Sequence, residues 1–404
     1  MSKSITLSSW YADNLPNGIS FNAAGGIFSG SPNVTPGEYL VPVSVSTNYG
    51  SDSKDIRFIV DETANPVYAI GAMAATWSNN AEPDAYGFRK LNIPNASRVN
   101  SIPAGFAAKC SGGKWYIGSS SSLPIYGGNG FSKGNSYYSP DVFDVDDVLD
   151  IKGGKMNNDA AGLYFAYQTP DETAVFGYSK SSSAYNNNFK LYTDNIKFLH
   201  KDFAYGFAAS SLDNEIFISA SNNVSFNYSA PAHVSDIPVK ALCPNIVGAS
   251  LAFFFLDAEL NLFEFSNNVS TRPDTDVPQI ILSDVSTFWL RFGGRQIWAL
   301  KSNGQLFARG NNISYILGYN DDSVNFKDFT YIGDFNAKKI ESPFMLTQDG
   351  KLFHSGLAVS GITSQHNGWT HIFPEYTFQD FSYIPGDASG LGTKTLTAII
   401  KERA

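Results

Sequence analysis

The chain has 404 residues and a formal net charge of −9, and 14% of its residues are aromatic while only 16% are charged. This composition excludes a disordered chain, and the acidic balance argues against a nucleic-acid groove, because neutralising phosphates requires a basic surface. The length suits one large all-β domain together with a small one.

The amino-terminal sequence and the cysteines set expectations about compartment. The first ten residues, MSKSITLSSW, lack a basic region followed by an apolar core, and the chain has no run of about 18 apolar residues. We therefore expect synthesis in a cytoplasm, no usual export and no membrane insertion. The cysteines, Cys110 and Cys243, fall in or beside strands predicted for different repeats. We expect two buried free thiols, without a disulfide or a cysteine metal site.

Residues 1–63 differ from the rest of the chain. Apolar positions alternate and break at turn residues every few positions, as in Leu15–Phe21, Gly26–Pro32 and Val41–Ser46. This segment resembles the Ig-like repeat of bacterial and phage surface proteins, with its pattern LPxGLs…tGxisGtP. The resemblance implies a small Ig-like β-sandwich. Since such sandwiches usually have about 100 residues and seven strands, the module is either small and self-sufficient or completed by a strand from a neighbouring subunit.

The segment Gln296–Gly318 predicts a β-hairpin that is buried on both faces. Ile297–Leu300 is apolar at every position, Ser302–Gly304 is turn chemistry, and Leu306–Ala308 is apolar again. A half-solvated hairpin would alternate apolar and polar residues, so we expect packing on each side of this one.

The same hairpin pattern occurs six times between residues 106 and 356. An aromatic residue in the second strand of each copy marks the period, with intervals of 60, 41, 46, 44 and 46 residues: Tyr116, Phe176, Phe217, Phe263, Phe307 and Phe353. A period near 45 residues built from strands is typical of β-propeller blades. We expect Phe307 and Phe353 to occupy equivalent core positions in adjacent blades.

The ends of this array predict how it closes. Val67–Gly71 resembles the second strand of a copy without a first, and Thr393–Ile400 resembles a first strand with nothing after it, preceded by a lead-in strand at Phe378–Ile384. The sequence therefore predicts an all-β fold, in which the small Ig-like sandwich (1–63) is followed by a seven-bladed β-propeller (64–404) closed by its N- and C-terminal strands.

A second resemblance supports the propeller. Ser302–Asn312, followed by Ile316–Tyr319, resembles the repeat of the RCC1-like propeller family, with its signature dGklyawGxN…LGxG. The likeness covers residues 66–402. It implies the fold, and we carry over no functional residue because the loops differ from those of the family.

The longest interval of the array contains the candidate binding residues. Between Gly118 and the next copy lie four aromatic side chains among glycines, serines and asparagines: Tyr126, Phe131, Tyr137 and Tyr138. Because rim loops of propellers commonly carry function, we expect these residues to contact a glycan or a protein. The alternative is that the tyrosines pack the loop onto its own blade.

Two sets of ionisable residues are candidates for catalytic or metal sites. An acidic cluster lacks the glycine and glutamate of a calcium-binding EF-hand loop and predicts the solvated face of an edge strand: Asp141, Asp144, Asp146, Asp147 and Asp150. Among the five scattered histidines, His366 and His371 fall with Trp369 and Glu375 in one predicted loop, without a nucleophile motif. We expect that the protein binds no metal and no cofactor and is not an enzyme.

These features favour a phage virion structural protein. In this interpretation the Ig-like module anchors the chain to other virion proteins of the capsid or tail, and the propeller acts as a head that binds host-surface glycan or protein. Localisation would be the virion. The alternatives are a capsid decoration protein, an intracellular interaction scaffold and, from a different class, a glycan-cleaving enzyme with a rim acid pair.

Overall fold

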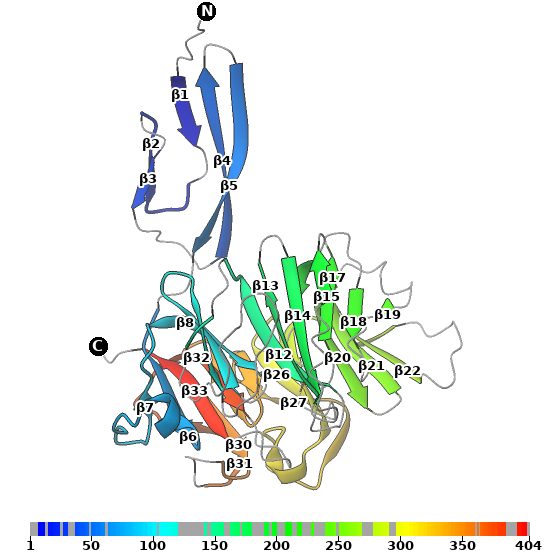
Figure 1. The fold of residues 1–404 in the computed structure, drawn as a ribbon. Coiled ribbons are helices and arrows are strands. Elements are labelled where there is room, and N and C mark those ends of the chain that lie inside the picture. The colour runs from blue at the N-terminus through cyan, green and yellow to red at the C-terminus, as the bar shows by residue number, and fades with distance from the viewer. Residues whose placement is uncertain are drawn as a thin grey trace, which may run out of the picture. The chain divides into compact units, whose positions relative to one another are not determined.

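The computed structural model contains two compact units, residues 1–64 and residues 65–404 (Figure 1). The structure describes residues 7–12, 15–24, 27–30, 37–47, 50–60, 64–102, 105–119, 141–143, 147–156, 162–169, 172–179, 190–193, 196–199, 207–211, 216–219, 228–229, 239–247, 250–268, 278–290, 296–359, 362, 364–384 and 394–401. Within them, no helix is long and apolar enough to cross a membrane.

The part of the first unit that the structure describes forms five strands in two antiparallel sheets. The three-stranded sheet has the order β1-β4-β5, and the other sheet pairs β2 with β3. Their bounds are β1 (Leu7–Ala12), β2 (Ile19–Asn22), β3 (Ile27–Gly30), β4 (Gly37–Thr47) and β5 (Gly50–Val60). Val41 and Val43 on β4 are buried, and the rings of Phe21 and Phe28 lie 4.7 Å apart between β2 and β3. An alternating strand pattern with apolar residues on one face accounts for this small sandwich.

The described residues of the second unit form seven four-stranded antiparallel sheets, the architecture of a seven-bladed propeller. Four of them follow in chain order as β8 (Ala96–Ile102), β9 (Gly105–Cys110), β10 (Trp115–Ser119) and β11 (Asp141–Val142); β12 (Asp150–Met156), β13 (Gly162–Gln168), β14 (Glu172–Ser179) and β15 (Lys190–Thr193); β16 (Ile196–Leu199), β17 (Phe207–Ser211), β18 (Ile216–Ser219) and β19 (Tyr228–Ser229); β20 (Val239–Val247), β21 (Ser250–Asp257), β22 (Leu262–Asn268) and β23 (Gln279–Leu282).

Three further sheets and two short helical turns are also present among the described residues of this unit. They are β24 (Val285–Leu290), β25 (Gln296–Lys301), β26 (Gln305–Asn311) and β27 (Asn325–Asp334); β28 (Ala337–Glu341), β29 (Phe344–Thr347), β30 (Leu352–Gly356) and β31 (His366–Ile372); β32 (Phe378–Ile384), β33 (Thr395–Ile400), β6 (Val67–Gly71) and β7 (Arg89–Lys90); and the helical turns α1 (Ala74–Trp77) and η1 (Ile313–Tyr315).

The predicted hairpin of β25 and β26 is buried on both faces. Trp298 and Leu300 pack in one apolar cluster with residues of β28 and β29, whereas Ile297 and Ala299 pack in another with residues of β21 and β22. All four side chains are at most 5% exposed. Since alternate residues of a strand point to opposite faces, each sheet here is covered by its neighbours on both sides, and the prediction is confirmed.

The aromatic residues that mark the period share a register but differ from the prediction in burial. Phe307 lies opposite Ala299, and Phe353 lies opposite Met345, at equivalent positions of their sheets. Both rings are only half-buried, while the preceding Leu306 is fully buried, as is Leu352 before Phe353. The period-two alternation places the leucines in the sheet-to-sheet core and the aromatics on the opposite, less covered face.

One four-stranded sheet is formed from both ends of the array, as predicted. Its order is β32-β33-β6-β7, and β33 pairs with β6 so that Leu396 faces Ile70 and Ala398 faces Tyr68 (Figure 1). One face of this sheet packs on residues of β29, and the other packs on residues of β8 and β9. Strands separated by most of the chain are therefore joined in a single sheet.

The buried thiol of Cys110 is free, in agreement with the prediction for this residue. Burial raises its pKa to about 12, so the thiol stays protonated at neutral pH. The side chain of Cys243 lies outside the described part of the chain.

Candidate functional site

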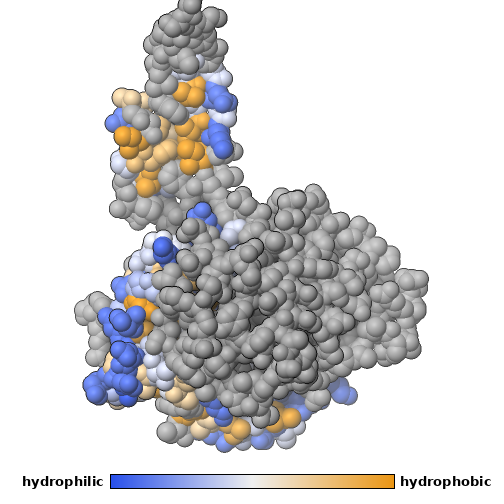
Figure 2. Space-filling view, in the orientation of Figure 1, coloured by the Kyte–Doolittle hydropathy of each residue, from blue (hydrophilic) through white to orange (hydrophobic). Residues whose placement is uncertain are grey.

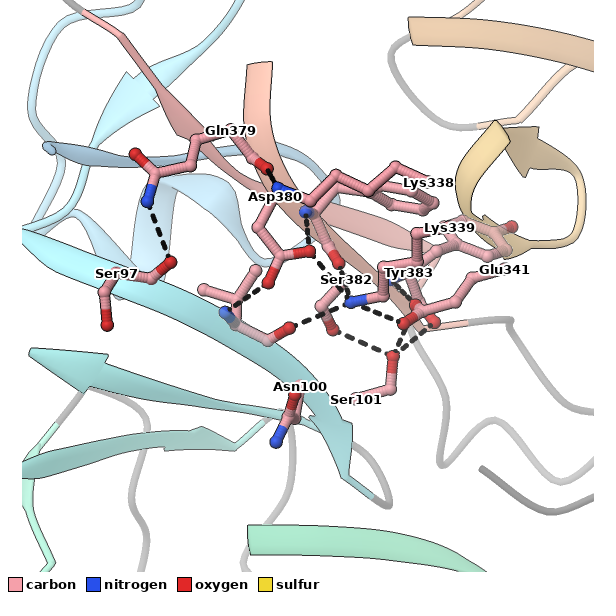
Figure 3. A network of polar contacts seen from close by, with 12 residues as sticks. Ser97, Asn100, Ser101, Lys338, Lys339, Glu341, Gln379, Asp380, Ser382 and Tyr383 are labelled. Carbon is pink, nitrogen blue, oxygen red and sulfur yellow. Dashed lines mark hydrogen bonds and ion pairs between the residues drawn. The ribbon is translucent and has the colours of Figure 1, made fainter. Parts of the chain in front are cut away.

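A network of polar side chains connects the first strands of three sheets (Figure 3). We call it the inter-sheet network and define it by five residues from β8, β28 and β32: Ser101, Lys339, Glu341, Asp380 and Ser382. First strands are sheet edges, so their outward N–H and C=O groups need partners from elsewhere. The network supplies these partners.

Lys339 lies at the centre of the inter-sheet network. Its Nζ donates to the carbonyl oxygen of Val99 (3.0 Å) and to that of Phe381, and it forms ion pairs with Asp380 Oδ1 (3.1 Å) and Glu341 Oε1 (3.0 Å). The ammonium therefore contacts backbone or carboxylate oxygens of all three strands. It also lies over the Phe381 ring, 5.3 Å from the centroid.

The two carboxylates of the inter-sheet network each accept bonds from neighbouring strands. Asp380 Oδ2 accepts from Val99 N (2.8 Å), while Glu341 Oε2 accepts from Tyr383 N (2.7 Å) and Ser101 Oγ (2.7 Å). Ser101 Oγ also lies 2.9 Å from Ser382 Oγ. Buried carboxylates are retained when such donors replace water.

This arrangement is suited to holding strands rather than to acid–base chemistry. The side chains of Lys339, Glu341 and Asp380 are 13%, 12% and 9% exposed. Both carboxylates contact the same ammonium and backbone N–H donors. Because each oxygen is occupied, a substrate would have to displace a buried ion pair to reach either acid, which is costly.

The sequence contained a signal for the inter-sheet network that the repeat pattern concealed. Polar residues stand two apart in the lead-in strands, with Lys339 and Glu341 on β28 and Asp380 and Ser382 on β32. A spacing of two places them on one face of each strand. These polar positions lie outside the apolar hairpins, so the hairpin repeat does not reveal them.

The contacts of the network show that β8, β28 and β32 run in the same direction. One set of contacts joins Val99, Lys339 and Asp380. The next set, two residues further along each strand, joins Ser101, Glu341 and Ser382. In an antiparallel four-stranded sheet, the first and third connections lie at the same end. The connections after β10, β30 and β6 are the third connections of their sheets. Because the first strands run in the same direction, all three connections lie at the same end of the propeller unit.

The predicted binding residues belong to the connection after β10. Tyr126, Phe131, Tyr137 and Tyr138 lie outside the described residues, whereas the flanking Ser119 and Asp141 are described at the ends of β10 and β11. Their role stays a prediction.

A second polar group joins β8 to β12 and corrects the prediction for one member of the acidic cluster, Asp150. Asp150 lies 3.0 Å from Arg98 and 3.3 Å from Lys152, and it accepts a bond from Asn100 Nδ2 (3.0 Å). Burial alone would raise the pKa of Asp150, but Lys152 and Arg98 hold it below its ordinary value. Asp150 is thus an inter-sheet ion pair and not part of a solvated strand face. Asp144 and Asp146 lie outside the described residues.

The connection between β26 and β27 is organised by Asn312, which lies in the segment that resembles the propeller repeat. Its fully buried amide donates through Nδ2 to the carbonyl oxygens of Tyr319 (2.7 Å) and Asp321 (2.6 Å), and its Oδ1 accepts from Leu317 N (2.8 Å). Gly318 follows with φ +84°, and a Cβ there would fall 2.0 Å from the indole nitrogen of Trp369. Only glycine fits this contact.

The histidines are distributed differently from the prediction. His366 and His371 both lie on β31 and not in a loop. His366 Nδ1 lies 2.8 Å from Nδ1 of the fully buried His354, so one ring donates to the other. Burial, with the neighbouring His366, lowers the pKa of His354 to about 4, and burial also lowers the pKa of His366. Within the described part of the chain, no group of three or more His, Cys, Asp or Glu residues is placed to hold a metal.

Comparisons with known proteins agree with the two-unit fold. Residues 2–61 match the family described as "Putative Ig domain". No curated protein sequence matches the chain. Among solved structures, human WBSCR16 is 12% identical with a TM-score of 0.58, covering 85% of this chain and all of that one.

Two structures of a yeast protein give similar values. The structure of Prp20p from Saccharomyces cerevisiae, described together with its binding to Gsp1p and histones, is 9% identical with a TM-score of 0.59, covering 84% of this chain and 92% of that one. Yeast RCC1 (Prp20) bound by Kap60 is 9% identical with a TM-score of 0.58, covering 85% and 90%. At these identities the likeness establishes an RCC1-like propeller fold.

Proposed function

We propose that this chain is a non-enzymatic binding protein, in which the propeller unit presents the binding surface. The supporting observation is that the described ionisable groups at the first strands, Lys339, Glu341 and Asp380, are occupied with one another and with backbone groups. The structure of the similar yeast propeller is described together with its binding to Gsp1p and histones, which favours a protein ligand for this propeller as well.

More specifically, we propose a structural component of a phage virion. The support is the Ig-like segment at residues 2–61, a type of module that occurs on phage and bacterial surfaces, and loops rich in Asn, Ser, Tyr and Gly. The Ig-like unit would anchor the chain to capsid or tail proteins. The propeller would contact a host-surface protein or glycan through Tyr126, Phe131, Tyr137 and Tyr138, whose large faces suit adaptable recognition.

Quantitative mass spectrometry of purified particles from the producing cells tests the virion role. We expect the full chain in the particles at a fixed ratio to the major capsid protein, and a chain without residues 1–64 to be lost from them. Recovery of the full chain only in the cytoplasm, bound to cellular proteins, would favour the intracellular scaffold. Release of sugars from host polysaccharide by the purified chain would contradict the non-enzymatic assignment.

A further inference from the structure

Two neighbouring connections of the propeller unit form an exposed surface of apolar and acidic residues. We call it the rim surface and define it by Ile313, Tyr319 and Leu357 together with Asp321 and Asp322. Ile313 is 57% exposed, Leu357 is 56% exposed and Tyr319 is 40% exposed. Figure 2 shows apolar residues among hydrophilic ones along the edge of this unit that lies lowest in the view.

The two connections contact each other directly. The Ser314 carbonyl oxygen lies only 3.0 Å from the position that a Cβ on Gly356 would occupy, and Ser355 Oγ donates to the Tyr315 carbonyl oxygen (2.6 Å). Ile313 directly precedes Ser314, and Leu357 directly follows Gly356. The apolar side chains of the rim surface therefore come from adjoining segments of two sheets.

The backbone that presents Ile313 is strained and held firmly. Ser314 and Tyr315 adopt positive φ values of 57° and 61°, a region that is unfavourable for residues other than glycine. The buried Asn312 amide holds the segment that follows, through hydrogen bonds to the backbone of Leu317 and Tyr319. Such strain persists only where surrounding contacts impose it, and it concentrates at binding sites.

The charge beside these apolar residues is negative. Asp321 and Asp322 are exposed, and Asp328 is exposed on the adjoining β27, against a single exposed Lys327 in the same stretch. Hydrogen bonds from Ser323 lower the pKa of Asp321, so its carboxylate is ionised at neutral pH. A second copy of the same surface would bring like charges together.

We propose that the rim surface binds a segment of a partner protein that carries aliphatic side chains together with lysine or arginine. The aliphatic groups would cover Ile313 and Leu357, and the cations would face Asp321 and Asp322, since complementary charge and a small apolar centre are the common features of such interfaces. This proposal rests on the proposed binding function and specifies the chemistry of one ligand.

Fluorescence anisotropy with two synthetic peptides tests the proposal on the full chain. One labelled dodecapeptide alternates leucine with lysine, and the other alternates leucine with glutamate. We expect at least about tenfold tighter binding of the lysine peptide, which corresponds to about 1.4 kcal/mol. Raising the salt concentration should weaken that binding, because exposed charges are screened.

Matched variants distinguish the rim surface from a general attraction to an acidic protein. The variants Ile313→Ser/Leu357→Ser and Asp321→Asn/Asp322→Asn should each weaken binding about fivefold or more. The control Ile280→Ser/Glu259→Gln changes one apolar residue that is 55% exposed and one exposed acid elsewhere, and it should bind normally. Thermal melting checks that each variant is folded.

Three results would overturn the rim-surface proposal: equal binding of both peptides, no binding of either, or equal weakening by the control variant. The particle measurement is independent of these results. A chain absent from particles that still binds the lysine peptide would refute the virion role alone. A chain present in particles that binds neither peptide would refute the rim surface alone.

Discussion

At the scale of single residues, the position of a side chain within its strand determines its burial more than its residue type does. Leu306 and Phe307 are neighbours on β26, yet Leu306 is fully buried in the cluster shared with β28 and β29, whereas the larger Phe307 is half-buried. The Phe307 ring instead lies 5.7 Å from the ring of Tyr331 and under the ammonium of Lys301. The size and hydrophobicity of a side chain therefore do not identify the core residues here unless the strand register is also known.

We expect Leu306→Ala to lower the free energy of unfolding by about 2–5 kcal/mol, as a fully buried leucine does when a cavity is left. Phe307→Ala should cost less, near the average of about 1 kcal/mol for point substitutions, because the ring is only partly covered. Urea denaturation of both variants gives the comparison. A larger loss for Phe307→Ala than for Leu306→Ala would contradict the observed register.

The His354–His366 contact predicts a pH dependence of stability. The pKa of buried His354, about 4, lies below the ordinary histidine value near 6.5, so the unfolded chain takes up a proton first as the pH falls. This contribution to stability is complete above about pH 6.5 and decreases toward pH 4, by at most about 1.4 kcal/mol per pH unit for one proton.

Denaturation at several pH values between 7 and 4.5 measures this effect. His354→Gln should show a shallower loss of unfolding free energy with falling pH than the unsubstituted chain, whatever its stability at pH 7. Carboxylates contribute equally to both proteins, so the difference in slope isolates the histidine. Identical slopes would show that His354 is not responsible.

At the scale of elements, strands covered on both faces were the most predictable. Runs such as Ile297–Leu300 have no polar face, and this pattern located β25 and its partner correctly. A binding role for the connection that contains Tyr126 was predicted from its length and composition alone, which carry no information on contacts. The inter-sheet network was missed because its bonds join β8 to β28 and β32, more than 200 residues away, and no local pattern encodes such pairing.

The repeat signature also has a physical basis that the structure reveals at Asn312. In the sequence, this asparagine is one position of a resemblance, whereas in the structure its amide closes the turn from Asn312 to Asp321 with three hydrogen bonds. A buried side-chain amide is well suited to this role because it both donates and accepts. The motif therefore marks a loop anchor.

We expect Asn312→Ala to destabilise the chain by about 1–3 kcal/mol, because carbonyl oxygens lose buried donors. Hydrogen exchange should accelerate at the Leu317 amide, which donates to Asn312 Oδ1. Asn320→Ala, an exposed asparagine in the same connection, is the control and should leave that amide protected. Unchanged exchange at Leu317 in Asn312→Ala would show that the turn is held by other contacts.

At the scale of the whole propeller unit, the sheet formed from both ends is fixed by apolar packing and by the inter-sheet network. Lys339 and Glu341 come from the preceding sheet, Ser101 comes from the following one, and Asp380 belongs to the sheet itself. The three sheets around the junction are thus bonded to one another. Loss of the central ammonium would leave two buried carboxylates without a counter-charge.

We expect Lys339→Met to cost about 3–5 kcal/mol of unfolding free energy, as removal of one partner from a buried ion pair does. Adding Glu341→Gln and Asp380→Asn should restore part of the loss, because no unpaired charge then remains. Lys351→Met is the control, since Lys351 also forms an ion pair (2.6 Å, with Asp349) but both side chains are more than half exposed. Its effect should stay below about 1 kcal/mol. Equal losses for the two lysine variants would refute a special role for the network.

The pairing of β33 with β6 also determines how the propeller unit can be connected to other proteins. Ile400 N donates to the Pro66 carbonyl oxygen (3.2 Å), so the first and last strands of this unit along the chain lie side by side in one sheet. Units whose ends adjoin tolerate insertion into the loop of a host domain and circular permutation. The two ends of a unit of over 300 residues thus lie as close together as the two ends of a hairpin. A surface loop of another protein could therefore carry the whole propeller as an insertion.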